Sequence, residues 1–248
     1  MRKISLFAAL LLAAFVARGA ALGAQTPVTA DDFYNRGIDY LDDENWDRAI
    51  SDFTQALRLS PNDIDAYYWR GSAYFEKGDY HNAINDYNQV LRLDPEDIDA
   101  FYWRACSYFE TGDYDRAISD YSKVIAFDPY DIDAFYWRGF TYYEIYDYDR
   151  AITDFTQVLK LDPDDIDAYY WRGWSHLEKG SWDRAAADFT QMIRLDPYDA
   201  DTFGNRGYVY YMQSMYAEAR ADVNKALQLD PGYEYAKTLA ADLAALGY

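Results

Sequence analysis

All seven prolines of the chain are separated by intervals of 34 residues. They are Pro27, Pro61, Pro95, Pro129, Pro163, Pro197 and Pro231. A fixed period of this length indicates stacked repeats, each of which is one supersecondary unit that buries its apolar side against its neighbours. Such arrays mostly present extended binding surfaces, so the spacing favours a protein that binds a partner over one that encloses a reaction.

The segment from Asp63 to Asp97 shows how one repeat is built. Asp63 is suited to cap a helix, and Gly78 is suited to end that helix in the left-handed conformation. A second amphipathic helix follows and ends before Pro95. Two helices of about 13 residues each are too short to be stable alone, so each hairpin must pack against the next. One face of the first helix carries Tyr67, Arg70, Gly71 and Tyr74, and the second helix carries Ala83, Ile84, Tyr87, Val90 and Leu91.

The pattern Tyr67-x2-Arg70-Gly71-x2-Tyr74, followed by Ala83-x3-Tyr87 and Pro95, resembles the tetratricopeptide repeat. Six copies in one register, repeats 1 to 6, occupy residues 30–63, 64–97, 98–131, 132–165, 166–199 and 200–233. The resemblance implies an all-α fold, a right-handed α-solenoid of six helical hairpins whose first helices line a concave groove. Residues 234–248 resemble the capping helix that shields the last hairpin of such an array from water.

Every repeat departs from the family pattern by carrying arginine where leucine is most common, and every second helix carries an aspartate. An antiparallel return brings Asp86 opposite Arg70, so we predict six partly buried ion pairs with a structural role. The alternative is that each aspartate meets the arginine of the following hairpin. The arginines are Arg36, Arg70, Arg104, Arg138, Arg172 and Arg206, and the aspartates are Asp52, Asp86, Asp120, Asp154, Asp188 and Asp222.

A second stripe on the first helix contains Asp65, Tyr68, Ser72, Phe75 and Glu76, which are spaced by three or four residues and share one side. The resemblance implies that this side faces the groove, with a tyrosine row and an acidic edge that suit a ligand rich in lysine or arginine. The alternative is that the aromatic residues pack between repeats, as we expect of the tryptophans that follow each tyrosine. The tyrosines are Tyr34, Tyr68, Tyr102, Tyr136 and Tyr170, and the edge residues are Asp65, Asp99, Asp133 and Asp167.

One groove position varies from copy to copy, being small in repeats 2 and 3 and bulky in repeats 4 to 6. We interpret it as a ligand pocket that leads onto an aromatic platform; the alternative is drift at a half-exposed position. The residues are Ile38, Ser72, Cys106, Phe140, Trp174 and Tyr208. Cys106 is the only cysteine, so no intrachain disulfide forms. A buried small residue is the simpler interpretation of Cys106, and pairing between molecules is the other.

Residues 1–24 are typical of a secretory signal peptide, with a basic start, an apolar stretch and small residues around Gly23 and Ala24. A short leader of residues 25–29 precedes the repeats. We therefore predict export to the periplasm or cell envelope of a bacterium, with no membrane span after cleavage; an uncleaved anchor is the alternative. The net charge of −20 argues against nucleic acid and anionic membranes as partners.

No motif of metal-binding or catalytic chemistry is present in the sequence. The two histidines, His81 and His176, lie at different phases of different repeats, and all the carboxylates fall at repeat-periodic positions. We predict no enzyme activity and no cofactor. The favoured function is an interaction scaffold for a protein or peptide segment of basic or mixed apolar character. Glycan or peptidoglycan binding is the alternative, and self-association is a third possibility.

Overall fold

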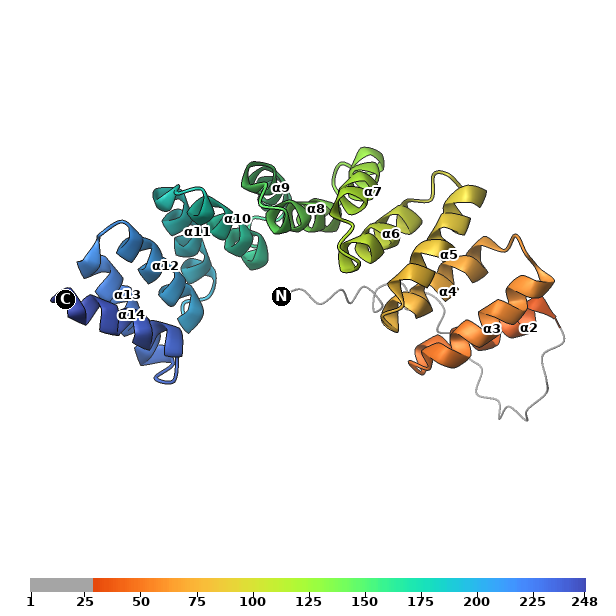
Figure 1. Cartoon of the computed structure of the whole chain (residues 1–248), viewed down its shortest axis with the longest axis horizontal. Helices are drawn as coiled ribbons and strands as arrows, with labels where there is room; N and C mark the ends of the chain where they lie inside the picture. Colours follow the sequence, from red (N-terminus) through yellow and green to blue (C-terminus); the bar gives the residue numbers. More distant parts are fainter. Residues whose placement is uncertain (1–28) are drawn as a thin grey trace. The chain divides into compact units, whose positions relative to one another are not determined.

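The computed structural model describes residues 29–248, and over those residues it contains thirteen α-helices and no strand (Figure 1). The signal peptide predicted for residues 1–24 lies outside the described residues. The predicted all-α array of helical hairpins is confirmed. Its helices are α2 (Ala30–Asp42), α3 (Trp46–Leu59), α4 (Ile64–Glu76), α5 (Tyr80–Leu93), α6 (Ile98–Glu110), α7 (Tyr114–Phe127), α8 (Ile132–Glu144), α9 (Tyr148–Leu161), α10 (Ile166–Glu178), α11 (Trp182–Leu195), α12 (Ala200–Met212), α13 (Tyr216–Leu229) and α14 (Glu234–Ala245).

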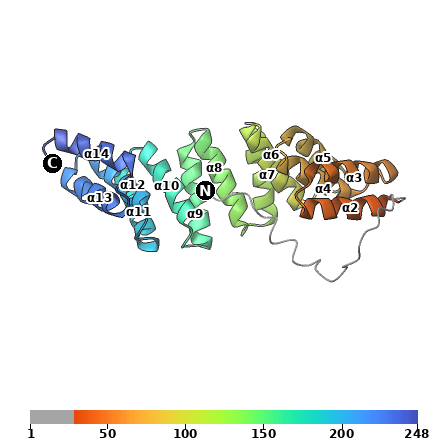
Figure 2. The same ribbon diagram turned by 90° about the horizontal axis from the view of Figure 1, so that it is seen from below.

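The helices form two compact units, of which the first ends at Lys123 and the second begins at Val124. In the first unit α2 packs against α3 and α4 against α5, and α3–α4 and α5–α6 contacts join successive hairpins. In the second unit the same order runs from α8 to α14, and each helix packs against the one that follows it (Figure 2). First helices of adjacent repeats also touch, namely α2 with α4 and α4 with α6 in the first unit, and α8 with α10 in the second unit, where α12 also touches α14.

The helix starts and the turns of the hairpins lie at the capping and turn residues of the sequence. The Asp63 side chain accepts a hydrogen bond of 3.0 Å from the Ala66 N–H at the start of α4, which satisfies a free donor of the first turn. Between the two helices of a repeat one residue is left-handed, with φ of 81° at Gly78. Three repeats adopt this conformation without glycine, at Glu44, Tyr146 and Ser214, where a Cβ makes it costly.

Small residues let the two helices of a hairpin cross closely. A Cβ added at Gly139 would lie 3.1 Å from the Cβ of Asp154 and 3.3 Å from the Phe155 ring. Ala151 is fully buried on the facing helix, as is Phe155. In repeats 1 to 5 the core of the hairpin is therefore an aromatic ring packed against small residues, and in repeat 6 Val223 takes the place of the ring.

Candidate functional site

The repeated arginines and aspartates are joined within each hairpin. In repeat 2, Nε and Nη2 of Arg70 each donate to one carboxylate oxygen of Asp86 at 2.7 Å. The same bidentate contact joins the arginine and the aspartate of every repeat. The aspartates therefore do not pair with the arginine of the following hairpin, which was the alternative. The pairs are Arg36–Asp52, Arg70–Asp86, Arg104–Asp120, Arg138–Asp154, Arg172–Asp188 and Arg206–Asp222.

The remaining donor of the guanidinium links one hairpin to the one before it. Nη1 of Arg70 donates to the Thr54 hydroxyl at 3.1 Å. Equivalent bonds join Arg104 to Asn88, Arg172 to Thr156 and Arg206 to Thr190. The Arg70 guanidinium also lies over the rings of Tyr67 and Tyr74, at 5.6 and 6.0 Å. All three nitrogens of this guanidinium donate a hydrogen bond within the protein and both neighbouring rings lie against it, so we assign the arginine a structural role rather than ligand binding.

The tyrosine row does not have one uniform exposure. Tyr34, Tyr68 and Tyr170 are half-buried, and each keeps part of its ring at the surface of the first helices. Tyr102 and Tyr136 are only 8 % and 3 % exposed, so the expectation that they line an open groove is wrong. Each packs edge-on against the core ring of its own hairpin, Tyr102 against Tyr121 and Tyr136 against Phe155, at 5.9 and 5.8 Å.

The exposed members of the row lie close to carboxylates from the next repeat. Burial raises the pKa of the Tyr34 hydroxyl, and the charge of Asp65 raises it further. Burial and the charge of Asp99 likewise raise the pKa of Tyr68. Asp65 and Asp99 are exposed, whereas Asp133 and Asp167 are half-buried. The predicted acidic edge therefore stands beside the tyrosines in repeats 1 to 3, where it forms a polar rim next to an aromatic surface.

The variable position is explained by the core and is not a pocket in repeats 2 and 3. Ser72 is buried, and its hydroxyl lies 3.2 Å from the hydroxyl of Tyr87. Cys106 is 1 % exposed, and the Tyr121 hydroxyl donates to its Sγ at 3.3 Å. Repeats 1, 4 and 5 have phenylalanine in place of that tyrosine, and they carry a larger residue here. The predicted pocket at Ser72 and Cys106 is thus filled by two tyrosine hydroxyls.

The bulky residues at this position remain partly exposed in the second unit. Phe140, Trp174 and Tyr208 are all half-buried. Phe140 touches Trp171 with ring centroids 4.6 Å apart, and Tyr208 lies 6.1 Å from Tyr235 of the last helix. Phe140 is linked to Trp174 through Trp171 and Tyr170, with successive ring centroids 4.6, 5.0 and 6.2 Å apart. Trp174 and Tyr208 pack against the same cluster, which contains Leu177 and Val209. Binding of a ligand on these rings stays a prediction.

The tryptophans that follow the tyrosines pack between adjacent first helices, as the sequence suggested. Trp103 of α6 lies 5.3 Å from Phe75 of α4, and Trp171 of α10 lies 5.0 Å from Tyr143 of α8. Trp69 packs beside the cluster of Leu41 and Ala73 in the first unit. Their role is to hold the layer of first helices together.

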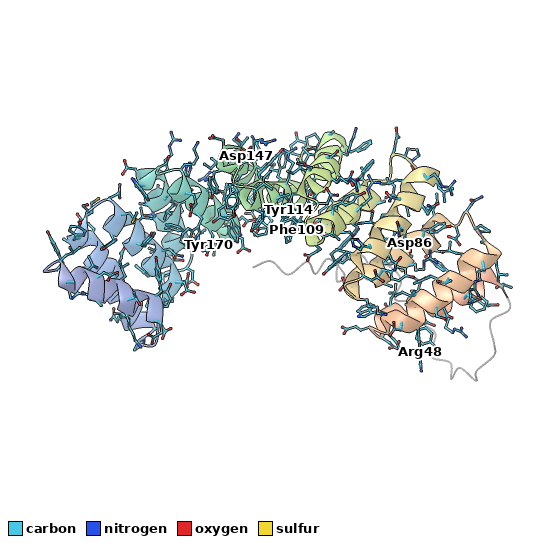
Figure 3. The ribbon with its side chains drawn as sticks, in the orientation of Figure 1. Arg48, Asp86, Phe109, Tyr114, Asp147 and Tyr170 are labelled. Atoms are coloured by element: carbon cyan, nitrogen blue, oxygen red, sulfur yellow. The ribbon has the colours of Figure 1, made fainter. Side chains whose placement is uncertain are left out.

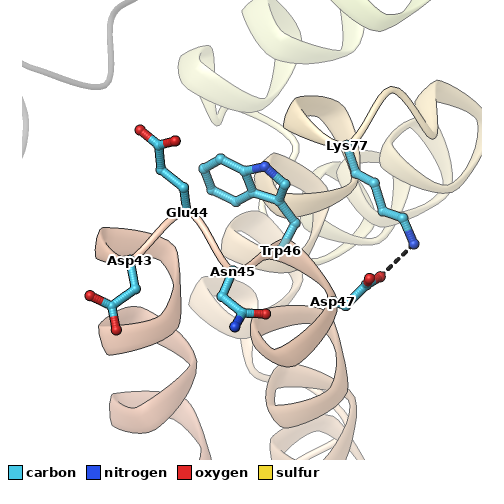
Figure 4. A pocket seen from close by; sticks show the side chains of 6 residues that line it. All are labelled: Asp43, Glu44, Asn45, Trp46, Asp47 and Lys77. Carbon is cyan, nitrogen blue, oxygen red and sulfur yellow. Dashed lines mark hydrogen bonds and ion pairs between the residues drawn. The ribbon is translucent and has the colours of Figure 1, made fainter.

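The turn between the two helices of a repeat is a site that the sequence analysis missed. Figure 4 shows Lys77 reaching from one hairpin to Asp47 on its neighbour, close to Trp46, where Nζ donates to the carboxylate at 2.5 Å. Related contacts span 30 residues in each case, and for the two lysine–aspartate pairs this spacing of opposite charges is visible in the aligned repeats. They are Lys77–Asp47, Lys179–Asp149 and Gln213–Asp183. Shallow cavities of about 260 and 340 Å³ adjoin the first two pairs.

Neither histidine belongs to a metal site or a catalytic arrangement. His81 is exposed, whereas His176 is buried and its Nδ1 has no hydrogen-bond partner in the described part of the chain. Over residues 29–248, no group of histidine, cysteine or carboxylate side chains is arranged to hold a metal ion. None of the described helices has the length and apolar character needed to cross a membrane.

Family models match the chain without a break from residue 34 to residue 233. A model described as TPR repeat matches residues 71–108 and 105–145. Two models described as tetratricopeptide repeat match residues 34–86 and 141–200, and residues 200–233. No protein of curated function matches the sequence.

Solved structures of repeat proteins resemble the chain at low sequence identity, which shows the fold alone. The C-terminal part of a repeat protein from Cytophaga hutchinsonii is 21% identical with a TM-score of 0.75, over 85% of this chain and 87% of that one. YrrB, described as having an unusual peptide-binding site, is 22% identical with a TM-score of 0.66, over 75% and 96%. MamA from Desulfovibrio magneticus is 24% identical with a TM-score of 0.66, over 70% and 98%.

Proposed function

This chain belongs to the tetratricopeptide repeat family. We propose that it is a non-catalytic scaffold that binds a segment of another protein on the side of its first helices that carries Tyr34 and Tyr68. One observation carries the proposal. The arginines of the repeats are occupied by internal partners, whereas Tyr34 and Tyr68 keep exposed ring surface beside the exposed carboxylates of Asp65 and Asp99. Of the features that recur along the array, this one remains available to a partner.

The chemistry of this surface favours a segment with basic and apolar side chains. Tyrosine rings offer a large contact area at low entropic cost, and adjacent carboxylates attract lysine or arginine. The net charge of −20 adds a long-range attraction for cationic partners. A peptide-binding site in YrrB, a protein of the same fold, supports the assignment at the level of the fold.

The test compares two pairs of charge removals in the first unit. Asp65→Asn with Asp99→Asn neutralises the rim, and Glu96→Gln with Asp115→Asn removes two exposed charges elsewhere. Asp65, Asp99 and Asp115 all occupy the second position of their helices, so the control reproduces one of the two first-turn charge losses of the rim variant, while Glu96 lies in the turn before α6.

The immobilised chain is used to capture proteins from an extract of the source cells, and the captured proteins are quantified by mass spectrometry. We expect the rim variant to lose basic partners that the control variant retains. Equal capture by both variants would show that the rim is not part of the docking surface. Capture that is unaffected by salt, together with retention on a glycan resin, would instead favour the glycan-binding alternative.

We also propose that the protein is exported to the periplasm or cell envelope, on the basis of the signal-like residues 1–24. Fractionation of the source cells with N-terminal sequencing of the mature protein tests this. A mature chain that begins near Gln25 is expected. An intact N-terminus in the cytoplasmic fraction would contradict export.

A further inference from the structure

Four aromatic rings of repeat 4 and one of repeat 5 form a run that extends from the first helix of repeat 4 to the turn that follows it. We call it the repeat-4 aromatic patch, and it consists of Phe140, Tyr143, Tyr146, Tyr148 and Trp171. Its rings are linked one to the next, with centroid distances of 4.6 Å for Phe140–Trp171, 5.0 Å for Trp171–Tyr143, 5.6 Å for Tyr143–Tyr148 and 6.3 Å for Tyr148–Tyr146.

No other repeat has aromatic residues at all four of the corresponding positions within one hairpin. In repeat 2 these positions are Ser72, Phe75, Gly78 and Tyr80, and in repeat 5 they are Trp174, Leu177, Gly180 and Trp182. Repeats 4 and 5 share a phenylalanine in the hairpin core, Phe155 and Phe189, yet of the two only repeat 4 has aromatic residues at each of the last three of these positions. The patch is a local feature of repeat 4.

Tyr146 has an unfavourable backbone conformation and little burial to offset it. Its φ is 64°, in the left-handed region where Gly78, Gly112 and Gly180 stand in other repeats. Its side chain is 78 % exposed, so it gains little from burial. A ring kept where glycine would be more stable, and kept in water, points to a binding role. The other four rings of the patch are half-buried and present part of their surface.

The charges around the patch are negative. Burial raises the pKa of Tyr143 to about 12, and the nearby carboxylates of Glu178 and Glu144 add to the rise. Among the residues that the structure describes, neither glutamate forms an ion pair. Two neighbouring cations have acidic partners of their own, since Lys179 donates a hydrogen bond to Asp149, and Arg150 donates one of 2.6 Å to Asp147, which is labelled in Figure 3. The rings therefore adjoin carboxylates that form no ion pair with any cation of residues 29–248.

The protein itself shows which cation suits such rings. The Arg150 guanidinium lies 4.4 Å from the centre of the Tyr142 ring, and Arg138 lies over Phe135 and Tyr142 at 5.7 and 5.9 Å. A planar guanidinium stacks on a ring face and bonds a carboxylate at the same time, which a lysine ammonium does less well.

We infer that the repeat-4 aromatic patch binds an arginine side chain of the partner segment, with stacking on Tyr146 and its neighbours and charge pairing to Glu178 and Glu144. The inference rests on the proposed function, because it names the chemistry of one anchor point for the same kind of partner. It predicts that the partner carries an exposed arginine rather than only an apolar anchor.

The probe is the peptide acetyl-Leu-Arg-Gly-Leu-Arg-Gly-amide, and its control contains citrulline, the neutral counterpart of arginine. Binding to the full chain is followed by the indole N–H signals in NMR spectra, with the Trp171 signal identified by its absence in Trp171→Phe. We expect the arginine peptide to shift the Trp171 signal saturably in the millimolar range, and the citrulline peptide to shift it far less.

Tyr146→Gly is the decisive variant because it removes a ring while relieving the left-handed strain, so weaker binding is not explained by unfolding. We expect about tenfold weaker binding of the arginine peptide. The control is Tyr198→Ala, which removes another highly exposed tyrosine (79 % exposed) of the second unit outside the patch and is expected to leave the affinity unchanged.

Three outcomes would overturn the inference: no saturable shift of Trp171, equal shifts with citrulline, or equal affinities of Tyr146→Gly and the unaltered chain. The capture experiment with Asp65 and Asp99 separates this inference from the proposed function. If the rim variant loses partners but Tyr146→Gly still binds the peptide normally, the inference about the patch is refuted and the proposed function stands. If the patch binds the peptide as expected but the rim variant captures the same proteins as its control, only the docking role of Asp65 and Asp99 is refuted.

Discussion

Removing the charge of Asp86 should destabilise the protein more than most surface or core changes of similar size (Figure 3). In Asp86→Asn the Arg70 guanidinium stays in place with no compensating charge, and its side chain is only 17% exposed. Water cannot replace the lost partner there, so we expect the free energy of unfolding to fall by about 3–5 kcal/mol.

The geometry supports that magnitude independently. Asp86 accepts two charge-assisted hydrogen bonds, both of 2.7 Å. Bonds to charged groups are worth about 1.5–3 kcal/mol each. Asparagine keeps one acceptor oxygen and turns an NH2 donor toward the guanidinium, so one of the two bonds is lost and the other no longer has a charged acceptor. The bond from Arg70 to Thr54 and the ring contacts remain, which keeps the guanidinium at its buried site and maintains the penalty.

Two further variants make the reasoning refutable. In Asp52→Asn the partner Arg36 is 36% exposed, so we expect a loss of about 1–2 kcal/mol because water reaches the guanidinium. Replacing both Arg70 and Asp86 with leucine should leave the stability within about 1 kcal/mol of the original, since no charge is then buried.

Urea titration followed by circular dichroism measures all three differences. A loss below about 1 kcal/mol for Asp86→Asn would refute the argument, because a buried unpaired charge costs more than that. Equal losses for Asp86→Asn and Asp52→Asn would also refute it, since burial would then not set the cost. A double variant as unstable as the single one would show that the ion pair itself, not the orphaned charge, matters.

Three other predictions concern stability. Ser72→Ile should lower the free energy of unfolding by about 1–3 kcal/mol, because the larger side chain crowds the Tyr87 hydroxyl. Adding Tyr87→Phe should restore most of that loss in the same urea titration. If stability is not restored, the two positions do not interact as we argue. Gly78→Ala should cost about 1 kcal/mol through its φ of 81° alone, as the added Cβ meets nothing within 4 Å, and an unchanged midpoint would exclude backbone strain. Burial lowers the pKa of His176, so the unfolded chain takes up this proton first as the pH falls below about 6.5. His176→Tyr should therefore gain stability over the original as the pH falls from about 7 to 5, and parallel curves would refute this.

Most of the architecture could be read from the spacing of residues. The repeat length, the two helices and the capping aspartates follow from positions along one chain, and the same positions narrowed the partner of each arginine to two aspartates, between which the structure decided. Arg70 and Asp86 meet because the turn at Gly78 reverses the chain halfway between them, and this relation is the same in every copy.

The exposure of the predicted site residues could not be read in that way. Tyr68 and Tyr102 occupy equivalent positions, yet one keeps exposed surface and the other is 8 % exposed. The sequence analysis predicted a pocket at Ser72 and Cys106 because these two residues are smaller than those at the same position in the other repeats. In the folded hairpin the hydroxyls of Tyr87 and Tyr121 occupy that space.

By itself the sequence determined the kind of fold and the side of each helix on which a residue lies, because helix geometry ties a position in the chain to a direction. Only the tertiary structure decided which of those residues reach water, since burial depends on the volumes of side chains from the neighbouring helices that close over them. The same reason explains the repeat-4 aromatic patch, whose rings are separated along the chain and become continuous only when α8, α9 and α10 pack together.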